Sequence, residues 1–172
     1  MTDTAYAELW RDLVEHSRGD PARSEERMMA RWRKRARSSG YTAEKRRRDR
    51  DDPLMRFVLD RLEDEDTVLD VGAGIGRWSI PMARRCRKVT ALDKLDAMLE
   101  ILRENTAREK VGNIEIVQGD WHEIDLEPHD YVLSSHAAYA SPDIVGYARK
   151  MEALANKACY LVMRVPKYDG VL

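Results

Sequence analysis

The sequence predicts a doubly wound α/β fold, with a mainly parallel sheet of about five strands, flanking helices and an N-terminal helical extension. Two observations lead to this fold class. From residue 52 onward, short apolar runs alternate with amphipathic patterns of helical spacing. Strands and helices that alternate at these lengths are typical of a parallel sheet covered on both faces. In addition, the distinctive polar residues of the second half each follow the end of a predicted strand.

The predicted strands are short runs rich in branched apolar residues. Val68, Leu69 and Val71 form the first, in a run that is too short for a helix and has the composition of a buried strand. The other four predicted strands are 88–92, 113–117, 131–134 and 159–165.

Apolar spacing and capping residues mark the helices. We expect one helix over 4–16 and a second that begins at Ser24 and ends before Gly40. Asp52-Pro53 and Ser141-Pro142 each combine an N-cap residue with proline at the first helical position. Another helix follows the glycines near residue 76, and one begins at 96 and stops at 112. The apolar side chains that we expect on the inner faces of these helices are Leu54, Phe57, Val58, Leu62, Trp78, Ile80, Met82, Ala83, Met98, Leu99, Leu102, Ala107, Ile144, Val145, Ala148, Met151 and Leu154.

A length of 172 residues suits one domain with an appendage. We expect a helical extension or lid over 1–50 and a core domain over 51–172. Positive charge is concentrated in the extension, since residues 31–50 contain ten basic side chains and two acidic ones. Such a run is either a phosphate-binding surface, whose affinity for RNA depends strongly on salt, or a solvated face.

The composition also excludes several classes of protein. No apolar stretch approaches the roughly 20 residues of a membrane-spanning helix, and the polar N-terminus lacks the features of a signal peptide. We therefore expect a cytoplasmic protein without a membrane partner. Cys86 and Cys159 are the two cysteines, and neither has a C-x-x-C partner or metal-ligand spacing. We expect packing roles for both and no metal site.

The stretch 67–78 is a strand that runs into a glycine-rich turn. Gly72, Gly74 and Gly76 let the backbone turn sharply and approach a ligand closely, because they have no β-carbon. A dinucleotide fingerprint, G-x-G-x-x-G, requires a third glycine where this chain has Arg77. The pattern here is instead D-x-G-x-G-x-G, beginning at Asp70.

Carboxylates follow the next two predicted strands. Asp93 lies about 20 residues beyond the glycines, the spacing at which a carboxylate accepts hydrogen bonds from ribose hydroxyls. Asp120 follows the third strand, and Ser134-Ser135-His136 ends the fourth. In a doubly wound sheet, ligands bind outside the carboxyl ends of the strands, so we expect these residues to form one site.

The D-x-G-x-G-x-G pattern with its ordered acids resembles motif I and the following motifs of the class I S-adenosylmethionine-dependent methyltransferases. The resemblance covers residues 52–165 and implies a Rossmann-like fold, S-adenosyl-L-methionine as cofactor and S-adenosyl-L-homocysteine as product. In this interpretation the glycine turn and Asp70 meet the amino-acid part, Asp93 the ribose and Asp120 the adenine, with Trp121 or Met98 covering the ring. The cofactor-binding residues that we expect are Asp70, Gly72, Ala73, Gly74, Gly76, Trp78, Asp93, Lys94, Met98, Gly119, Asp120, Trp121 and Ser135.

The family transfers the sulfonium methyl group to a nucleophile by in-line displacement, so the protein mainly supplies alignment and exclusion of water. For an acceptor that must lose a proton, His136 is the best-placed base, and Tyr139 is a second catalytic candidate. The Asn/Asp-Pro-Pro-aromatic signature of the adenine and glutamine amide enzymes is missing, which argues against those acceptors. We expect a small-molecule acceptor. An RNA methyltransferase that uses residues 31–50 and a non-catalytic binding domain are the alternatives.

One departure from the family concerns the last strands. The family sheet has seven strands, and we find no sixth or seventh after Val165. We expect either a fragment of a longer protein or a variant whose open sheet edge is covered in a homo-oligomer, because a bare edge favours aggregation.

Overall fold

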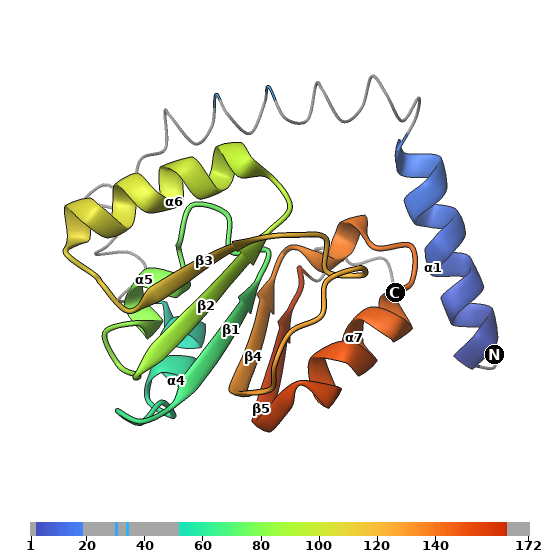
Figure 1. The fold of residues 1–172 in the computed structure, drawn as a ribbon. Coiled ribbons are helices and arrows are strands. Elements are labelled where there is room, and N and C mark those ends of the chain that lie inside the picture. Colours follow the sequence, from blue (N-terminus) through green and yellow to red (C-terminus); the bar gives the residue numbers. More distant parts are fainter. Residues whose placement is uncertain (1–2, 19–29, 31–33, 35–51, 165–172) are drawn as a thin grey trace.

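The structure, a computed structural model, describes residues 3–18, 30, 34 and 52–164. Its centre is a five-stranded sheet of order β3-β2-β1-β4-β5 (Figure 1). All four strand pairings are parallel. The strands are β1 (Thr67–Val71), β2 (Lys88–Asp93), β3 (Ile114–Gln118), β4 (His129–Ser135) and β5 (Ala155–Val162). The predicted doubly wound fold is therefore confirmed.

Helices cover the two faces unequally. One face packs against α4 (Pro53–Leu59), α5 (Ser79–Met82) and α6 (Asp96–Glu109). The other packs against α7 (Ile144–Ala153), which follows a short 3-10 turn, η1 (Ala138–Ala140). The N-terminal helix α1 (Asp3–Arg18) lies beside α7 and outside it (Figure 1). The helix predicted over 4–16 is thus confirmed, whereas the helix predicted from Ser24 and the basic stretch 31–50 lie outside the described residues.

The alternation of side chains along each strand divides the core into two layers. On β1, Val68 faces α4 and α5, whereas Leu69 and Val71 face α7. Both layers are well buried, since these three side chains are at most 2% exposed. Burying a side chain of this size contributes about 1.5–3 kcal/mol to stability, so the central strand holds both layers together.

Three predicted helix faces are wrong in detail. On α4, Met55 and Val58 pack on the sheet, whereas Leu54 and Phe57 are exposed. Phe57 instead lies under the guanidinium of Arg61, 3.5 Å from the ring centroid. On α6 the exposed Ala107 does not face the sheet, and the helix ends at Glu109, before Gly112, with Lys110 in the left-handed region at φ 55°. On α7 the predicted Val145 is 37% exposed.

Two predicted boundaries are also wrong. The cap of α7 is Asp143, whose side chain accepts a hydrogen bond from the amide of Gly146 at 2.9 Å, and Ser141 ends η1 instead. Strand β5 begins at Ala155, four residues before the predicted Cys159, because Ala155 already pairs with His129 of β4. The backbone ladder of β4 extends the strand beyond its apolar run.

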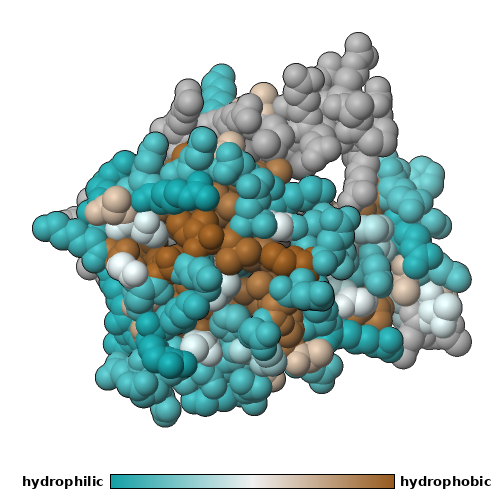
Figure 2. Space-filling model, in the orientation of Figure 1, coloured by the Kyte–Doolittle hydropathy of each residue, from teal (hydrophilic) through white to brown (hydrophobic). Residues whose placement is uncertain are grey.

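The α7 face of the sheet is open over β2 and β3. Residues 119–128, which connect β3 to β4, contain no helix, unlike the connections that carry α5, α6 and α7. Figure 2 shows apolar side chains gathered on this side of the molecule within a hydrophilic surround. A cavity of about 940 Å³ lies there, lined by residues that include Thr90, Val117 and Leu126.

Candidate active site

Strand order reverses between β1 and β4, and most of the predicted site residues lie at the carboxyl ends of β1, β2, β3 and β4. Backbone hydrogen bonds join these ends. The amides of Gly72 and Ala73 both donate to the carbonyl of Leu92, at 2.8 and 2.9 Å. The amide of Gly119 donates to the backbone carbonyl of Asp93 at 3.2 Å. The turn after β1 therefore folds over the end of β2, and the end of β2 contacts the start of the loop after β3.

The glycines of this turn are required by its conformation. Gly72 has φ +74° and Gly74 φ +56°, values in the left-handed region that costs other residues roughly 1–2 kcal/mol. A β-carbon on Gly72 would overlap the β-carbon of Ala137, in the loop after β4. Beside Gly74, by contrast, a β-carbon would meet no atom of the described residues within 4 Å. The turn thus packs tightly against the β4 loop at one glycine and leaves room for a ligand at the other.

Asp93 fastens the turn to β2. Its Oδ2 accepts the amide of Gly74 at 2.8 Å and its Oδ1 accepts the amide of Leu95 at 2.9 Å. Burial raises the pKa of the Asp93 carboxyl, and the backbone N–H groups of Leu95 and Gly74 oppose that shift. A carboxylate has about four acceptor positions, so Asp93 retains capacity for a further hydrogen bond.

Asp70 lies beneath the turn, in the core. It is 1% exposed, and Ser79 at the start of α5 donates its hydroxyl to Oδ2 at 2.5 Å. Burial raises the pKa of Asp70 to about 7, against the hydrogen bond from Ser79. The nearly complete burial and the bond to Ser79 give Asp70 the position of a support for the turn.

Asp120 and Lys94 form an ion pair across the ends of β3 and β2, with 3.1 Å between Nζ and Oδ2. The amide of His122 also donates to Asp120 at 2.9 Å, and this bond lowers the pKa of the carboxyl. Both residues remain partly exposed at the sheet edge, where a ligand can reach them.

Four predicted cofactor residues lie mainly in the core. Ala73, Trp78, Met98 and Trp121 are each at most 7% exposed. Trp121 packs with Tyr147 of α7, with 5.6 Å between ring centroids. Within the described part of the chain, the indole N–H groups of Trp78 and Trp121 are buried without a hydrogen-bond partner. Covering the adenine with Met98 or Trp121 stays a prediction.

Asn105 is a supporting residue that the sequence analysis did not identify. It is 1% exposed on α6, and its Nδ2 donates to the carbonyl of Ile75 inside the glycine turn at 2.9 Å. Its signal in the sequence is a polar residue three positions after Leu102, on the face that the helix buries. Gly76 contacts the same helix, because a β-carbon there would overlap Leu102.

His136 and Tyr139 come together in the loop after β4. The Nδ1 atom of His136 is 3.2 Å from the hydroxyl of Tyr139, and the two rings are nearly parallel. The His136 side chain is exposed, and Ser135 beside it is partly buried at the end of β4. Partial burial lowers the pKa of His136, and the positive charges of Arg164 and Arg77 lower it further. This shift favours the neutral imidazole.

Ser134 and Tyr147 form a buried pair next to this loop, with 2.7 Å between their hydroxyl oxygens. Burial raises the pKa of Tyr147 to about 12, so its hydroxyl stays protonated. This pair joins α7 to the end of β4 and thereby positions the segment that carries His136.

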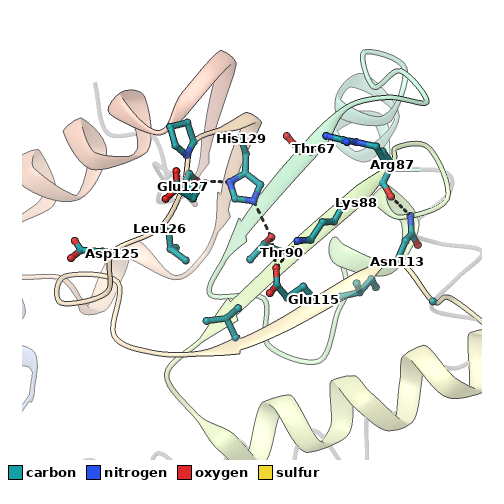
Figure 3. A pocket seen from close by; sticks show the side chains of 14 residues that line it. Thr67, Arg87, Lys88, Thr90, Asn113, Glu115, Asp125, Leu126, Glu127 and His129 are labelled. Atoms are coloured by element: carbon teal, nitrogen blue, oxygen red, sulfur yellow. Dashed lines mark hydrogen bonds and ion pairs between the residues drawn. The ribbon is translucent and has the colours of Figure 1, made fainter.

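A second polar network lies in the open cavity on the sheet face. Figure 3 shows His129 between Glu127 and Thr90, with the Lys88–Glu115 ion pair beyond. His129 Nδ1 lies 2.8 Å from the carbonyl of Glu127, and Nε2 lies 2.9 Å from the hydroxyl of Thr90. Burial lowers the pKa of His129. Thr90 lies in the middle of β2, so this network is separate from the carboxyl-end site.

Neither a metal site nor a membrane span is found among the residues that the structure describes. No group of three or more His, Cys, Asp and Glu side chains there could hold a metal ion. None of the helices in the described ranges has both the length and the apolar character needed to cross a bilayer.

The chain combines a parallel sheet of this strand order with a glycine turn after β1 and carboxylates at the carboxyl ends of β2 and β3. These are the features of the class I S-adenosylmethionine-dependent methyltransferases. The family model described as a methyltransferase domain matches residues 68–157, which are 90 of the 172 residues. The chain belongs to this methyltransferase-domain family, and the cofactor of the class is S-adenosyl-L-methionine.

Individual proteins agree with this assignment. The chain is 36% identical over 87 residues to "Probable ribosomal RNA small subunit methyltransferase A" of Methanosphaera stadtmanae. The match covers 49% of this chain and 32% of the relative, so the chain spans about a third of that protein's length.

Two solved structures share the fold. Phosphoethanolamine N-methyltransferase 1 of Haemonchus contortus has a TM-score of 0.61 and 21% identity, over 100% of this chain and 35% of that one. Magnesium protoporphyrin IX methyltransferase of Synechocystis has a TM-score of 0.59 and 21% identity, over 68% of this chain and 58% of that one.

Proposed function

We propose that the protein transfers the methyl group of S-adenosyl-L-methionine to a small-molecule acceptor, with His136 as the general base. The main support for the proposal is the glycine turn, which is hydrogen-bonded to the carboxylate of Asp93. The amide of Gly74 donates to Asp93 at 2.8 Å, and the space beside the α-carbon of Gly74 is open. The residues present fit the cofactor, because the turn offers a cradle that a β-carbon would fill.

The residues of the site divide the work between binding and chemistry. Asp93 holds the ribose hydroxyls, Asp120 accepts from the adenine amine, and the glycine turn contacts the amino-acid part. The bound cofactor supplies an activated methyl group. The chain's own contribution is to align the acceptor with this group and to exclude water.

His136 suits an acceptor hydroxyl or amine that must lose a proton. A base has to be unprotonated before the reaction, and the lowered pKa of His136 favours that form. Its side chain is exposed at the carboxyl edge, where an acceptor can reach it.

Calorimetry with S-adenosylhomocysteine, followed by methyl transfer assays with candidate acceptors, tests this proposal. We expect binding by the wild-type chain and by His136→Gln with equal affinity. Turnover by His136→Gln should fall by about 10²–10⁴-fold, the usual contribution of a general base. Absence of binding by the folded wild-type protein would refute the proposed function. Full turnover by His136→Gln would refute the base alone.

RNA is the second candidate acceptor, because the relative from Methanosphaera stadtmanae bears the name of a ribosomal RNA methyltransferase. The basic stretch 31–50 would supply the phosphate contacts. Replacing Arg46, Arg47 and Arg48 by Gln should then weaken RNA binding and reduce its dependence on salt. A small-molecule enzyme would keep its turnover in that variant.

A further inference from the structure

The loop that contains His136 is hydrogen-bonded to the carboxyl end of β5. The backbone N–H of His136 donates to the carbonyl of Val162 at 3.0 Å, and His136 has φ +59°. Its ring is held separately by Tyr139, whose hydroxyl lies 3.2 Å from Nδ1. The two ring planes differ by 11°, with 5.9 Å between centroids. Both the backbone and the ring of His136 therefore have defined partners.

The hydroxyl of Tyr139 has a second partner. The backbone N–H of Arg164 donates to the Tyr139 oxygen. A phenol oxygen has two lone pairs and one proton, so this bond leaves one lone pair and the proton. The remaining lone pair can accept a hydrogen bond from an Nδ1–H group of His136, or the hydroxyl can donate a hydrogen bond to Nδ1. The two arrangements place the imidazole proton on opposite nitrogens.

We propose that Tyr139, fixed by the Arg164 amide, is a positioning residue that holds His136 as the Nδ1–H tautomer and so leaves the Nε2 lone pair for proton abstraction. The proposal rests on the proposed function of His136 as base. The nitrogen that carries the proton is set by the hydrogen bond of the other nitrogen, which is the general rule for histidine.

The path of the acceptor's proton favours the Nδ1–H tautomer when His136 acts as the base. The acceptor atom forms its bond to the methyl carbon as the carbon–sulfur bond breaks, and the electron pair of that bond stays on sulfur. The acceptor's proton passes to Nε2 of His136. The resulting imidazolium must donate from Nδ1, and the Tyr139 lone pair already accepts that bond. The opposite tautomer would carry a proton on Nε2 and would need Tyr139 to reorient before each turnover.

The test reads the tautomer directly, by long-range ¹H–¹⁵N NMR of the four histidines in the full chain with S-adenosylhomocysteine. His136→Gln identifies the His136 signal by its loss. We expect the Nδ1–H form in the wild type and a mixture of tautomers in Tyr139→Phe. Tyr6→Phe is the matched control, because Tyr6 is a 58% exposed tyrosine on α1. Nε2–H in the wild type, or an unchanged tautomer in Tyr139→Phe, would overturn the proposal.

Kinetics provide the second readout. In Tyr139→Phe, kcat/KM should fall by about tenfold, the effect of one hydrogen bond, while affinity for S-adenosylhomocysteine stays constant. The acidic limb of the pH profile should move to lower pH, because the imidazolium loses its acceptor. An unmoved limb would contradict the positioning role. The NMR result does not depend on turnover, so failure of the proposed function and failure of this inference are separate outcomes.

Discussion

The two sides of the carboxyl edge are built differently. On the cofactor side, Asp70 is almost completely buried and Asp93 is bound by two backbone amides from nearby turns. On the acceptor side, His136 and Tyr139 are exposed and depend on backbone groups of Val162 and Arg164. The first side is held by groups in and next to the hydrophobic core, and the second is held by backbone groups at and after the end of β5.

The boundary of the family match agrees with this difference. The matched residues 68–157 contain the whole cofactor side. They also contain His136 and Tyr139, but they end before Val162 and Arg164, which hold these two side chains. The third anchor is Trp10 on α1, whose Nε1 donates to the carbonyl of Ser141 at 2.8 Å. In the proposed function, the shared part of the chain holds the methyl donor and parts outside it shape the approach of the acceptor, as expected when function depends on sites built onto a common fold.

The largest effect should follow from a substitution where the two sides touch. Gly72→Ala places a β-carbon against Ala137 and a side chain at φ +74°. Left-handed strain of roughly 1–2 kcal/mol and overpacking of roughly 1–3 kcal/mol should lower the free energy of unfolding by about 3–4 kcal/mol. Urea denaturation measures the change.

Two further variants separate strain from overlap. Gly74→Ala introduces similar backbone strain but no overlap with the described residues, so it should lower the free energy of unfolding by only about 1 kcal/mol. The double variant Gly72→Ala with Ala137→Gly should have a free energy of unfolding about 2 kcal/mol higher than that of Gly72→Ala alone, because the overlap is removed. Equal costs for the two single glycine variants would show that the turn and the β4 loop do not pack together.

The second prediction concerns the cofactor side alone. Asp93→Ala removes the acceptor of the Gly74 and Leu95 amides and should weaken S-adenosylhomocysteine binding about 100-fold, the effect of one or two hydrogen bonds to a charged group. Calorimetry measures the affinity. Asp96→Ala, an acid three residues further on, is the control and should bind normally. An unaffected Asp93→Ala would place the ribose elsewhere.

Much of the fold could be predicted because its signals are local. The apolar run 68–71, the glycines that follow it and the Asp52-Pro53 cap each specify their structure within a few residues. The wrong details depend on the partners that residues find in the folded chain. Phe57 is exposed and lies beside Arg61 and Tyr160. Strand β5 starts at Ala155 because β4 pairs with it there.

The candidate site could be predicted to a similar extent. The spacing from the glycines indicated Asp93, and the structure brings it to Gly74. Nothing in the spacing could indicate that Ser79 would bind Asp70, or that Asn105 would reach the turn from α6. Those contacts depend on how helices settle on the sheet, and local propensity does not determine that.

A third prediction uses the burial of Asp70. Its pKa is about 7 in the folded protein and about 3.9 in an unfolded chain. The folded state therefore binds more protons between these values, and stability falls as pH rises toward 7. When the pH rises from 5 to 8, the free energy of unfolding of Asp70→Asn should fall by about 2 kcal/mol less than that of the wild type.

Urea denaturation across this pH range measures both proteins. The other titrating groups are the same in the two chains, so the difference between the curves reports Asp70. Asp96→Asn serves as an exposed control and should follow the wild type. Parallel curves for Asp70→Asn and wild type would mean that Asp70 is ionised in the folded protein throughout.

The smallest effect should arise at the anchor farthest from the cofactor. Trp10→Phe keeps a ring on α1 but removes the hydrogen bond to Ser141, worth about 1 kcal/mol. If α1 supports the acceptor loop, KM for the acceptor should rise about fivefold while affinity for S-adenosylhomocysteine stays constant. Leu9→Ala, an exposed position on the same helix, should change neither value. Equal weakening of acceptor and cofactor by Trp10→Phe would mean that the helix supports the whole edge, and the division between a buried donor side and an externally held acceptor side would not extend to α1.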